Sequence, residues 1–205
     1  MCIRDRLEGV ADWYSRMSFL INPFAFAVAG GDFESIATVT VGSGGSATAV
    51  FDNIAGTFQH LHLRYVVRGT RSGSATDGIY LQYNTDTSSA NYVRYHGLAG
   101  NGSSANASTQ GSGVAAQNLL ANVTAADATA SIFGAGTVDI LDYANTSKYK
   151  TIRNFGGQDR NGAGNVELNS GLWMSTAAIT KITVGATAGN LAEFSTIALY
   201  GIKAP

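Results

Sequence analysis

The clearest alternation of apolar and polar residues lies in the segment 58–68, FQHLHLRYVVR. Its apolar positions are Leu61, Leu63, Tyr65 and Val67, and its polar positions are His60, His62, Arg64 and Arg68. A two-residue period is that of a β-strand with one face on a core and the other facing solvent or a partner. Turn-forming residues precede the segment, and GTRSGSATDG follows it. We therefore predict a β-strand whose leucines and tyrosine are buried.

The same pattern of short strands and glycine-rich loops continues downstream. Strands are expected at 34–41, 46–54, 78–83, 91–96, 130–133, 137–143, 148–155, 166–168, 172–174, 179–184 and 195–202. We expect 46–54 to form a hairpin with 34–41. Residues 97–118 are expected to form a surface excursion with room for a short edge strand, and 119–128 one helical turn. Roughly ten to thirteen strands without a long helix predict an all-β, antiparallel sandwich, jelly-roll-like.

The first residues are expected to be foreign to the native chain. MCIRDR at 1–6 resembles the translation of a transposon-end adapter used in sequencing libraries. We therefore predict that residues 1–16 are non-native read-through, and that Met17 is the native start. A genuine helix over this segment is the alternative, because near-helical spacing relates Leu7, Val10, Tyr14 and Met17.

Residues 17–32 are interpreted as an irregular apolar arm, broken by Pro23 and by the glycine pair at 30–31. Its phenylalanines, Phe24 and Phe26, are available to dock on a neighbouring subunit or on the edge of the same domain. A frayed lead-in is the alternative. Residues 33–205 are then expected to form a single sandwich domain.

Composition narrows the classes of function. Hydrophobic residues make up 45% of the 205 residues, which is enough for a core, whereas charged residues make up only 13% and the net charge is -1. We therefore expect no nucleic-acid partner, which would call for a basic excess. The apolar run 19–30 is too short to span a membrane, so no membrane insertion is expected. The single cysteine, Cys2, lies in the foreign segment, so neither disulfides nor thiol chemistry are expected.

Two patterns suggest metal ligands, and each has a simpler interpretation. His60 and His62 share a strand face, and His96 is the only other histidine. Three imidazoles could hold one ion, but half-exposed histidines on a polar face are the expected outcome. Asp159-x-Asn161-Gly162 with Glu167 resembles a calcium loop, but its fifth position is Ala163. We predict an Asn-Gly turn there, and no metal or other cofactor.

Catalytic patterns are weak. The four glutamates are Glu8, Glu34, Glu167 and Glu193, and none is paired with another acid at alternate strand positions. Sugar hydrolysis uses two carboxylates that flank the substrate, and Asp139 and Asp142 are expected on opposite faces of one strand. A nucleophile elbow of the serine-hydrolase type is not recognisable. We predict that the protein is not an enzyme.

One surface is a candidate for ligand or partner binding. If the strands on either side of NTDTSSAN pair, their outward residues form an aromatic and polar patch of Tyr80, Gln82, Tyr92 and Arg94. Aromatic faces with amide and guanidinium donors suit both sugars and protein partners. Ordinary cross-strand pairing on a wet face is the alternative.

Several phrases of the sequence resemble small virion structural proteins of tailed bacteriophages, many of them from marine and metagenomic phage genomes. The phrases are ESIATVTVGSGGSATAVFDNI, TFQHLHLRY, DILDYANTSKYKTIRNFGG, SGLWMST and IALYGIK, which together span about residues 33–203. The resemblance implies a β-sandwich on the virion surface, in a capsid decoration or tail fibre component assembled in the host cytoplasm. It implies no catalytic residues. Expected partners are further copies in a homo-oligomer and other virion proteins, and the alternative is an adhesin that binds a host-surface glycan.

Overall fold

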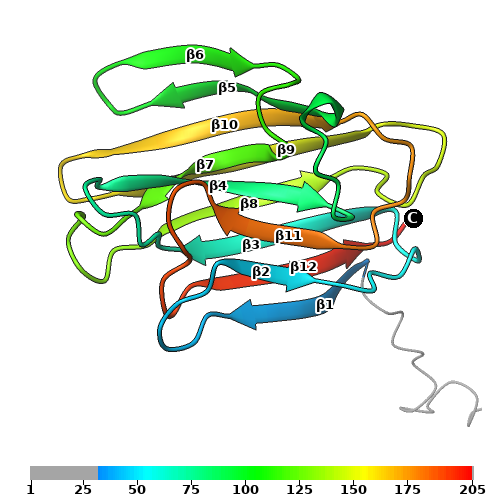
Figure 1. Ribbon diagram of the computed structural model, residues 1–205, viewed down its shortest axis with the longest axis horizontal. Helices are drawn as coiled ribbons and strands as arrows, with labels where there is room; N and C mark the ends of the chain where they lie inside the picture. The colour runs from blue at the N-terminus through cyan, green and yellow to red at the C-terminus, as the bar shows by residue number, and fades with distance from the viewer. Residues whose placement is uncertain (1–31, 205) are drawn as a thin grey trace, which may run out of the picture. The chain divides into compact units, whose positions relative to one another are not determined.

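The computed structural model describes residues 32–204, so the predictions for residues 1–16, and for nearly all of 17–32, lie outside the described residues. Twelve strands and a short 3₁₀ helix form the regular structure of this part (Figure 1). The strands are β1 (Phe33–Thr40), β2 (Thr48–Phe51), β3 (His60–Val67), β4 (Thr76–Tyr83), β5 (Tyr92–Gly100), β6 (Ala105–Gln110), β7 (Asn118–Thr124), β8 (Gly134–Ile140), β9 (Lys150–Asp159), β10 (Gly164–Trp173), β11 (Ile182–Ala186) and β12 (Thr196–Ile202). The helix, η1, is Ser89–Asn91.

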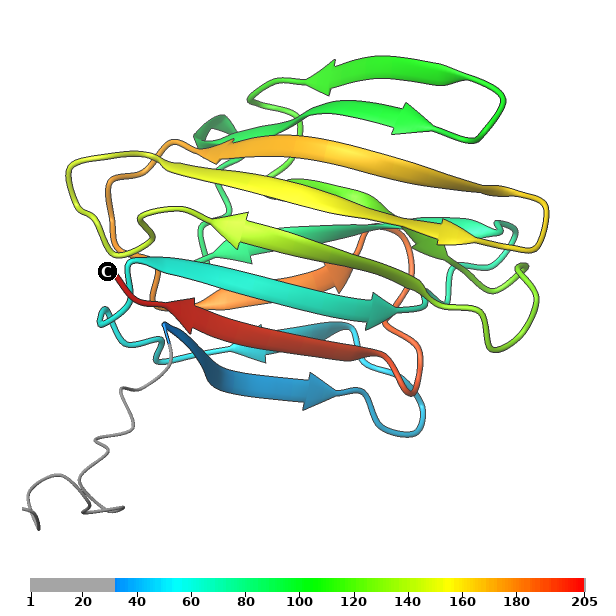
Figure 2. The same cartoon turned by 180° about the vertical axis from the view of Figure 1, so that it is seen from behind.

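The strands form two antiparallel sheets of unequal size that pack face to face (Figures 1 and 2). The large sheet has eight strands in the order β1-β12-β3-β8-β9-β10-β5-β6, and the small sheet has four in the order β2-β11-β4-β7. The predicted class, an all-β antiparallel sandwich, is confirmed. No helix in the described part of the chain is long and apolar enough to cross a membrane.

Strand β3 lies in the large sheet with the predicted orientation. Leu61, Leu63 and Tyr65 are buried against the small sheet, whereas Arg64 is exposed on the outer face. The core is completed by aliphatic side chains of both sheets, among them Ile79, Leu81, Val138, Ile140, Ile182, Val184, Ile197 and Leu199. Burial of these side chains is the main stabilising contribution of the sandwich.

One predicted strand pairing is wrong, and the pairing that the candidate patch required does not form. Strand β2 does not form a hairpin with β1; it pairs with β11 in the small sheet, and β1 pairs with β12. Strands β4 and β5 do not pair either, because the loop between them crosses from one sheet to the other. Alternation identifies a strand, but it does not say whether the next loop closes a hairpin or changes sheets.

Predictions of secondary structure also fail where a strand is buried on both faces, and where glycines lie inside a strand. Residues 118–124 form β7, not a helical turn, and both faces of this strand carry buried side chains. Gly156 and Gly157 belong to β9, so the predicted turn cluster shrinks to residues 160–163. The segment 130–133 is not a strand. Within 97–118, β5 continues to Gly100 and β6 forms the edge of the large sheet.

One edge of the small sheet, strand β7, is closed by side chains of the large sheet. Strand β7 pairs with β4 on one side only. On its other side, the Asn122 amide donates to Glu167 Oε1 at 3.1 Å, and Asn169 Nδ2 donates to the Leu120 carbonyl. Two side chains of β10 thus take the place of a neighbouring strand, since buried backbone groups need hydrogen-bond partners.

The β3 orientation predicts a clear difference between two alanine variants. Leu63→Ala should lower the free energy of unfolding by about 2–5 kcal/mol, because it leaves a cavity in the core. His62→Ala removes a partly exposed pairing with Asp139 at 2.6 Å and should cost about 1 kcal/mol or less. Chemical denaturation of both variants measures the difference, and a larger loss for His62→Ala would contradict the assignment of faces.

Candidate functional site

The outer face of the large sheet carries three cross-strand rows of side chains, which follow from the strand register. The first, which we call the small row, is Val66, Ala135, Gly157, Val166 and Gly100. The second, the ridge, is Arg64, Thr137, Phe155, Leu168, Leu98 and Ala107. The third, the polar row, is Tyr200, His62, Asp139, Arg153, Ser170, His96 and Thr109.

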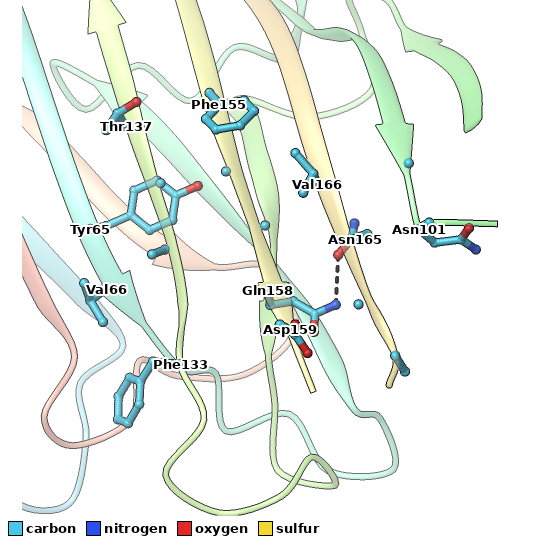
Figure 3. A pocket seen from close by; sticks show the side chains of 18 of the residues that line it. Tyr65, Val66, Asn101, Phe133, Thr137, Phe155, Gln158, Asp159, Asn165 and Val166 are labelled. Atoms are coloured by element: carbon cyan, nitrogen blue, oxygen red, sulfur yellow. Dashed lines mark hydrogen bonds between the residues drawn. The ribbon is translucent and has the colours of Figure 1, made fainter. Parts of the chain in front are cut away.

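The small row lies in a broad groove of about 960 Å³ (Figure 3). Ala135 and Gly157 have little or no side chain, so the sheet surface is depressed in the middle of the small row. Phe155 of the ridge projects next to this depression. The polar end of the groove contains Gln158, Asp159 and Asn165, and Gln158 Nε2 donates to Asn165 Oδ1 at 2.8 Å. The groove therefore combines an apolar floor with amide and carboxylate groups at one end.

Tyr65 supports the groove from beneath. Its ring passes under two glycines of neighbouring strands, Gly136 and Gly156, where a Cβ atom would overlap the tyrosine hydroxyl. The hydroxyl donates to Asn154 Oδ1 at 3.2 Å. Burial raises the pKa of Tyr65 and the negative charge of Glu167 raises it further, against a smaller opposite effect of the Asn154 hydrogen bond. Tyr65 therefore stays neutral at physiological pH.

Large apolar side chains are concentrated on this face. Five residues of the small row and the ridge are at least half exposed: Leu98 58%, Phe155 57%, Val166 53%, Leu168 53% and Val66 50%. The first four adjoin one another on β5, β9 and β10, whereas Val66 is separated from Val166 by Ala135 and Gly157. A second hollow, of about 720 Å³, lies between the ridge and the polar row on the side of β5 and β6. A cluster of exposed apolar side chains often marks an interaction site.

The polar row brings charges of both signs to the same face. His62 Nδ1 lies 2.6 Å from Asp139 Oδ1, and Asp139 is paired in register with Arg153 on β9. At the β1 side, the Arg64 guanidinium lies 5.9 Å from the centre of the Tyr200 ring, within cation–π range. The face is thus apolar along its middle and polar along one side.

The histidines do not converge. His60 accepts a hydrogen bond from the Asp142 backbone N–H at 3.0 Å, and His62 pairs with Asp139. His96 is on β5, with β8, β9 and β10 between it and β3. Among residues 32–204, no three His, Cys, Asp or Glu side chains are placed to hold a metal ion.

The region that resembles a calcium loop is a turn. Asp159 Oδ1 accepts the Asn161 backbone N–H at 2.8 Å, and Asn161 and Gly162 have φ angles of 60° and 98°. The predicted Asn-Gly turn is confirmed. Glu167 lies on the opposite face of the sheet, where it closes the edge of β7, so it does not join Asp159.

The predicted patch of Tyr80, Gln82, Tyr92 and Arg94 does not form, and this prediction is wrong as a single surface. Tyr80 and Gln82 belong to β4 in the small sheet, whereas Arg94 belongs to β5 in the large sheet and donates to Gln110 Oε1 at 2.6 Å. Tyr92 is fully buried. The cause is the loop that crosses between the sheets, which separates the two strands.

Tyr92 belongs instead to an aromatic cluster between the sheets. Its ring centroid lies 6.1 Å from that of Tyr83 and 6.5 Å from that of Trp173. Burial raises its pKa to about 12. Asp86 closes the cluster by accepting the Trp173 indole N–H at 2.8 Å. Partial burial raises the pKa of Asp86, but hydrogen bonds from Trp173, Asn91 and the Ser88 amide outweigh it and lower the pKa below its ordinary value.

Comparison with protein-family models, with curated proteins and with solved structures gives no match for this chain.

The packing of Tyr65 under the groove predicts which glycines tolerate a side chain. Gly136→Ala should lower the free energy of unfolding by about 1–3 kcal/mol, because the new methyl group overlaps the Tyr65 ring and approaches the Phe155 carbonyl oxygen to 2.8 Å. Gly111→Ala is the control, since no atom lies within 4 Å of its Cβ position, and it should change stability by less than about 0.5 kcal/mol. Equal effects in chemical denaturation would show that Tyr65 does not occupy this space.

Proposed function

We propose that this protein is a non-enzymatic structural component of a bacteriophage particle, and that it self-associates through the outer face of the large sheet. The observation that carries the proposal is the cluster of exposed apolar side chains formed by Phe155, Leu168, Leu98 and Val166 on this face. The phage origin rests on the resemblance of the sequence phrases to virion proteins, for which a surface β-sandwich is the expected architecture.

A second copy of the same chain is the partner that this face fits. An apolar surface bordered by both signs of charge can be self-complementary about a two-fold axis. Asp139 and Arg153 are neighbours in register beside the ridge. In such a contact, the Arg153 of each copy can face the Asp139 of the other while both ridges are buried. A particle built from many copies of one protein supplies that partner at high local concentration.

A non-enzymatic role is favoured by the chemistry of the groove. Among the described residues that line it, Asp159 is the single carboxylate, whereas sugar hydrolysis uses two. The alternative predicted from the sequence, an adhesin that binds a host-surface glycan, relied on the patch of Tyr80, Gln82, Tyr92 and Arg94. Because these residues are divided between two sheets, the patch no longer supports a glycan-binding role.

Light scattering of the full chain over a range of concentrations tests self-association. We expect an oligomer whose mass falls in the double variant Phe155→Ser/Leu168→Ser, because two apolar contacts in the middle of the face are lost. The matched control, Val114→Ser/Phe194→Ser, also replaces one aliphatic and one aromatic exposed residue, but outside this face, and should keep the native mass.

Two results would contradict this assignment. A native chain that is strictly monomeric at high concentration would exclude self-association. An oligomer of unchanged mass in Phe155→Ser/Leu168→Ser would assign the contact elsewhere, for example to the unpaired edges of β1 or β6. The phage assignment has its own test, the identity of the flanking genes, which should encode portal, capsid or tail proteins.

A further inference from the structure

A third cavity lies on the inner face of the large sheet, where this sheet extends beyond the small one. Strand β7 is one edge of the small sheet, and the β5–β6 hairpin of the large sheet continues past it (Figure 1). The cavity beneath this overhang has a volume of about 340 Å³, in the range of small-molecule sites. Its lining includes Tyr95, Asn106, Ser108, Asn122, Glu167 and Asn169. We propose that this cleft binds a neutral saccharide.

Glu167 is the most unusual group in this lining. It is only 5% exposed, and no cationic side chain pairs with it within residues 32–204. Its Oε1 atom accepts the Asn122 backbone N–H at 3.1 Å, Asn122 Nδ2 at 2.6 Å and Asn165 Nδ2. Its Oε2 atom has a single long contact, with Asn169 Nδ2 at 3.4 Å. A buried carboxylate is costly unless both oxygens are hydrogen-bonded.

The structural role of Glu167 accounts for the hydrogen bonds of its Oε1 atom, but it gives Oε2 no strong partner. Closure of the β7 edge uses Oε1, which is saturated by three donors. Oε2 retains acceptor capacity on the wall of a cavity. A ligand hydroxyl that donates to Oε2 would complete the hydrogen bonding of this carboxylate.

The opposite wall supplies free polar groups. Asn106 and Ser108 lie on the inner face of β6, since Ala105, Ala107 and Thr109 alternate with them and are in register with the outer rows. Neither side chain makes a hydrogen bond to another described residue. They add an amide and a hydroxyl, each able to donate and to accept.

The chemistry of the lining selects the class of ligand. The negative charge of Glu167 disfavours anions, and the amide nitrogens that surround it direct N–H groups where a metal ion would need oxygen atoms. A sugar ring offers hydroxyl groups at its edge, which match the mixed donors and acceptors, and C–H groups on its face, which can pack on the Tyr95 ring. The cleft lies on the opposite face of β5 and β10 from the ridge, so this proposal does not depend on self-association.

Saturation-transfer NMR of the full chain with free glucose, galactose, mannose and N-acetylglucosamine tests the proposal, with a neutral-glycan array for longer sugars. We expect saturable binding of at least one of these sugars. The double variant Asn106→Ala/Ser108→Ala should weaken binding by about tenfold or more, because it removes polar contacts to the ligand. Its melting temperature and its mass by light scattering should stay native, because both residues are exposed on an edge strand.

The matched control is Ala107→Ser, on the same strand with its side chain on the outer face, and it should bind sugar as the native chain does. The proposal is overturned if no neutral sugar binds the native chain in either assay. It is also overturned if Asn106→Ala/Ser108→Ala binds with native affinity. The two proposals are tested separately. Phe155→Ser/Leu168→Ser should lose oligomer mass and keep sugar binding, whereas Asn106→Ala/Ser108→Ala should lose sugar binding and keep the oligomer mass.

Discussion

A four-stranded sheet can cover only part of the eight-stranded sheet on which it packs, and the rest of this structure follows from that inequality. Where the two sheets overlap fully, the interior is aliphatic, as around Leu63, Ile140 and Leu81. Towards the edge of the small sheet, the inward residues become polar, as at Asn154, Gln158 and Glu167. The change in polarity lies where the covering sheet ends. Of these inward residues, Glu167 bonds to a backbone group of β7, which needs a partner at the sheet edge, whereas Asn154 and Gln158 bond to the side chains of Tyr65 and Asn165.

Side chains of β10 provide hydrogen-bond partners for the unpaired backbone groups of β7. Glu167 and Asn169 bind the backbone of β7 where a further strand would otherwise pair, and Gly97 leaves the space that the Asn169 side chain fills. An open edge invites pairing with other chains, so this closure protects β7. The same closure leaves a carboxylate oxygen on the wall of the cleft beneath the β5–β6 hairpin. The outer face of the large sheet has no covering layer among residues 32–204, and its apolar ridge is exposed.

The sequence predicted features that depend on neighbouring residues in the chain, such as which face of a strand is buried. The alternation in β3 identified both its faces, because a two-residue period does not depend on the partner strand. Pairing was not local. The segment containing Tyr92 has the same kind of alternation, but its loop changes sheets, and so an expected surface residue is fully buried. The rows of the outer face could not be foreseen either, because Phe155 and Leu168 become neighbours only through the register of β9 and β10. One signal was available: Asn165, Glu167 and Asn169 alternate in NVELN, which places two amides beside the glutamate on one strand face.

Hydroxyl-radical footprinting read by mass spectrometry tests whether the uncovered face of the large sheet is the contact between copies. Labelling of the full chain is compared at a dilute, monomeric concentration and at one where scattering shows the oligomer. If this face is the contact, Leu98, Phe155 and Leu168 lose labelling on association, while Phe194, exposed outside this face, does not change. Equal labelling of these three residues in both states would contradict this assignment, whatever the oligomer mass.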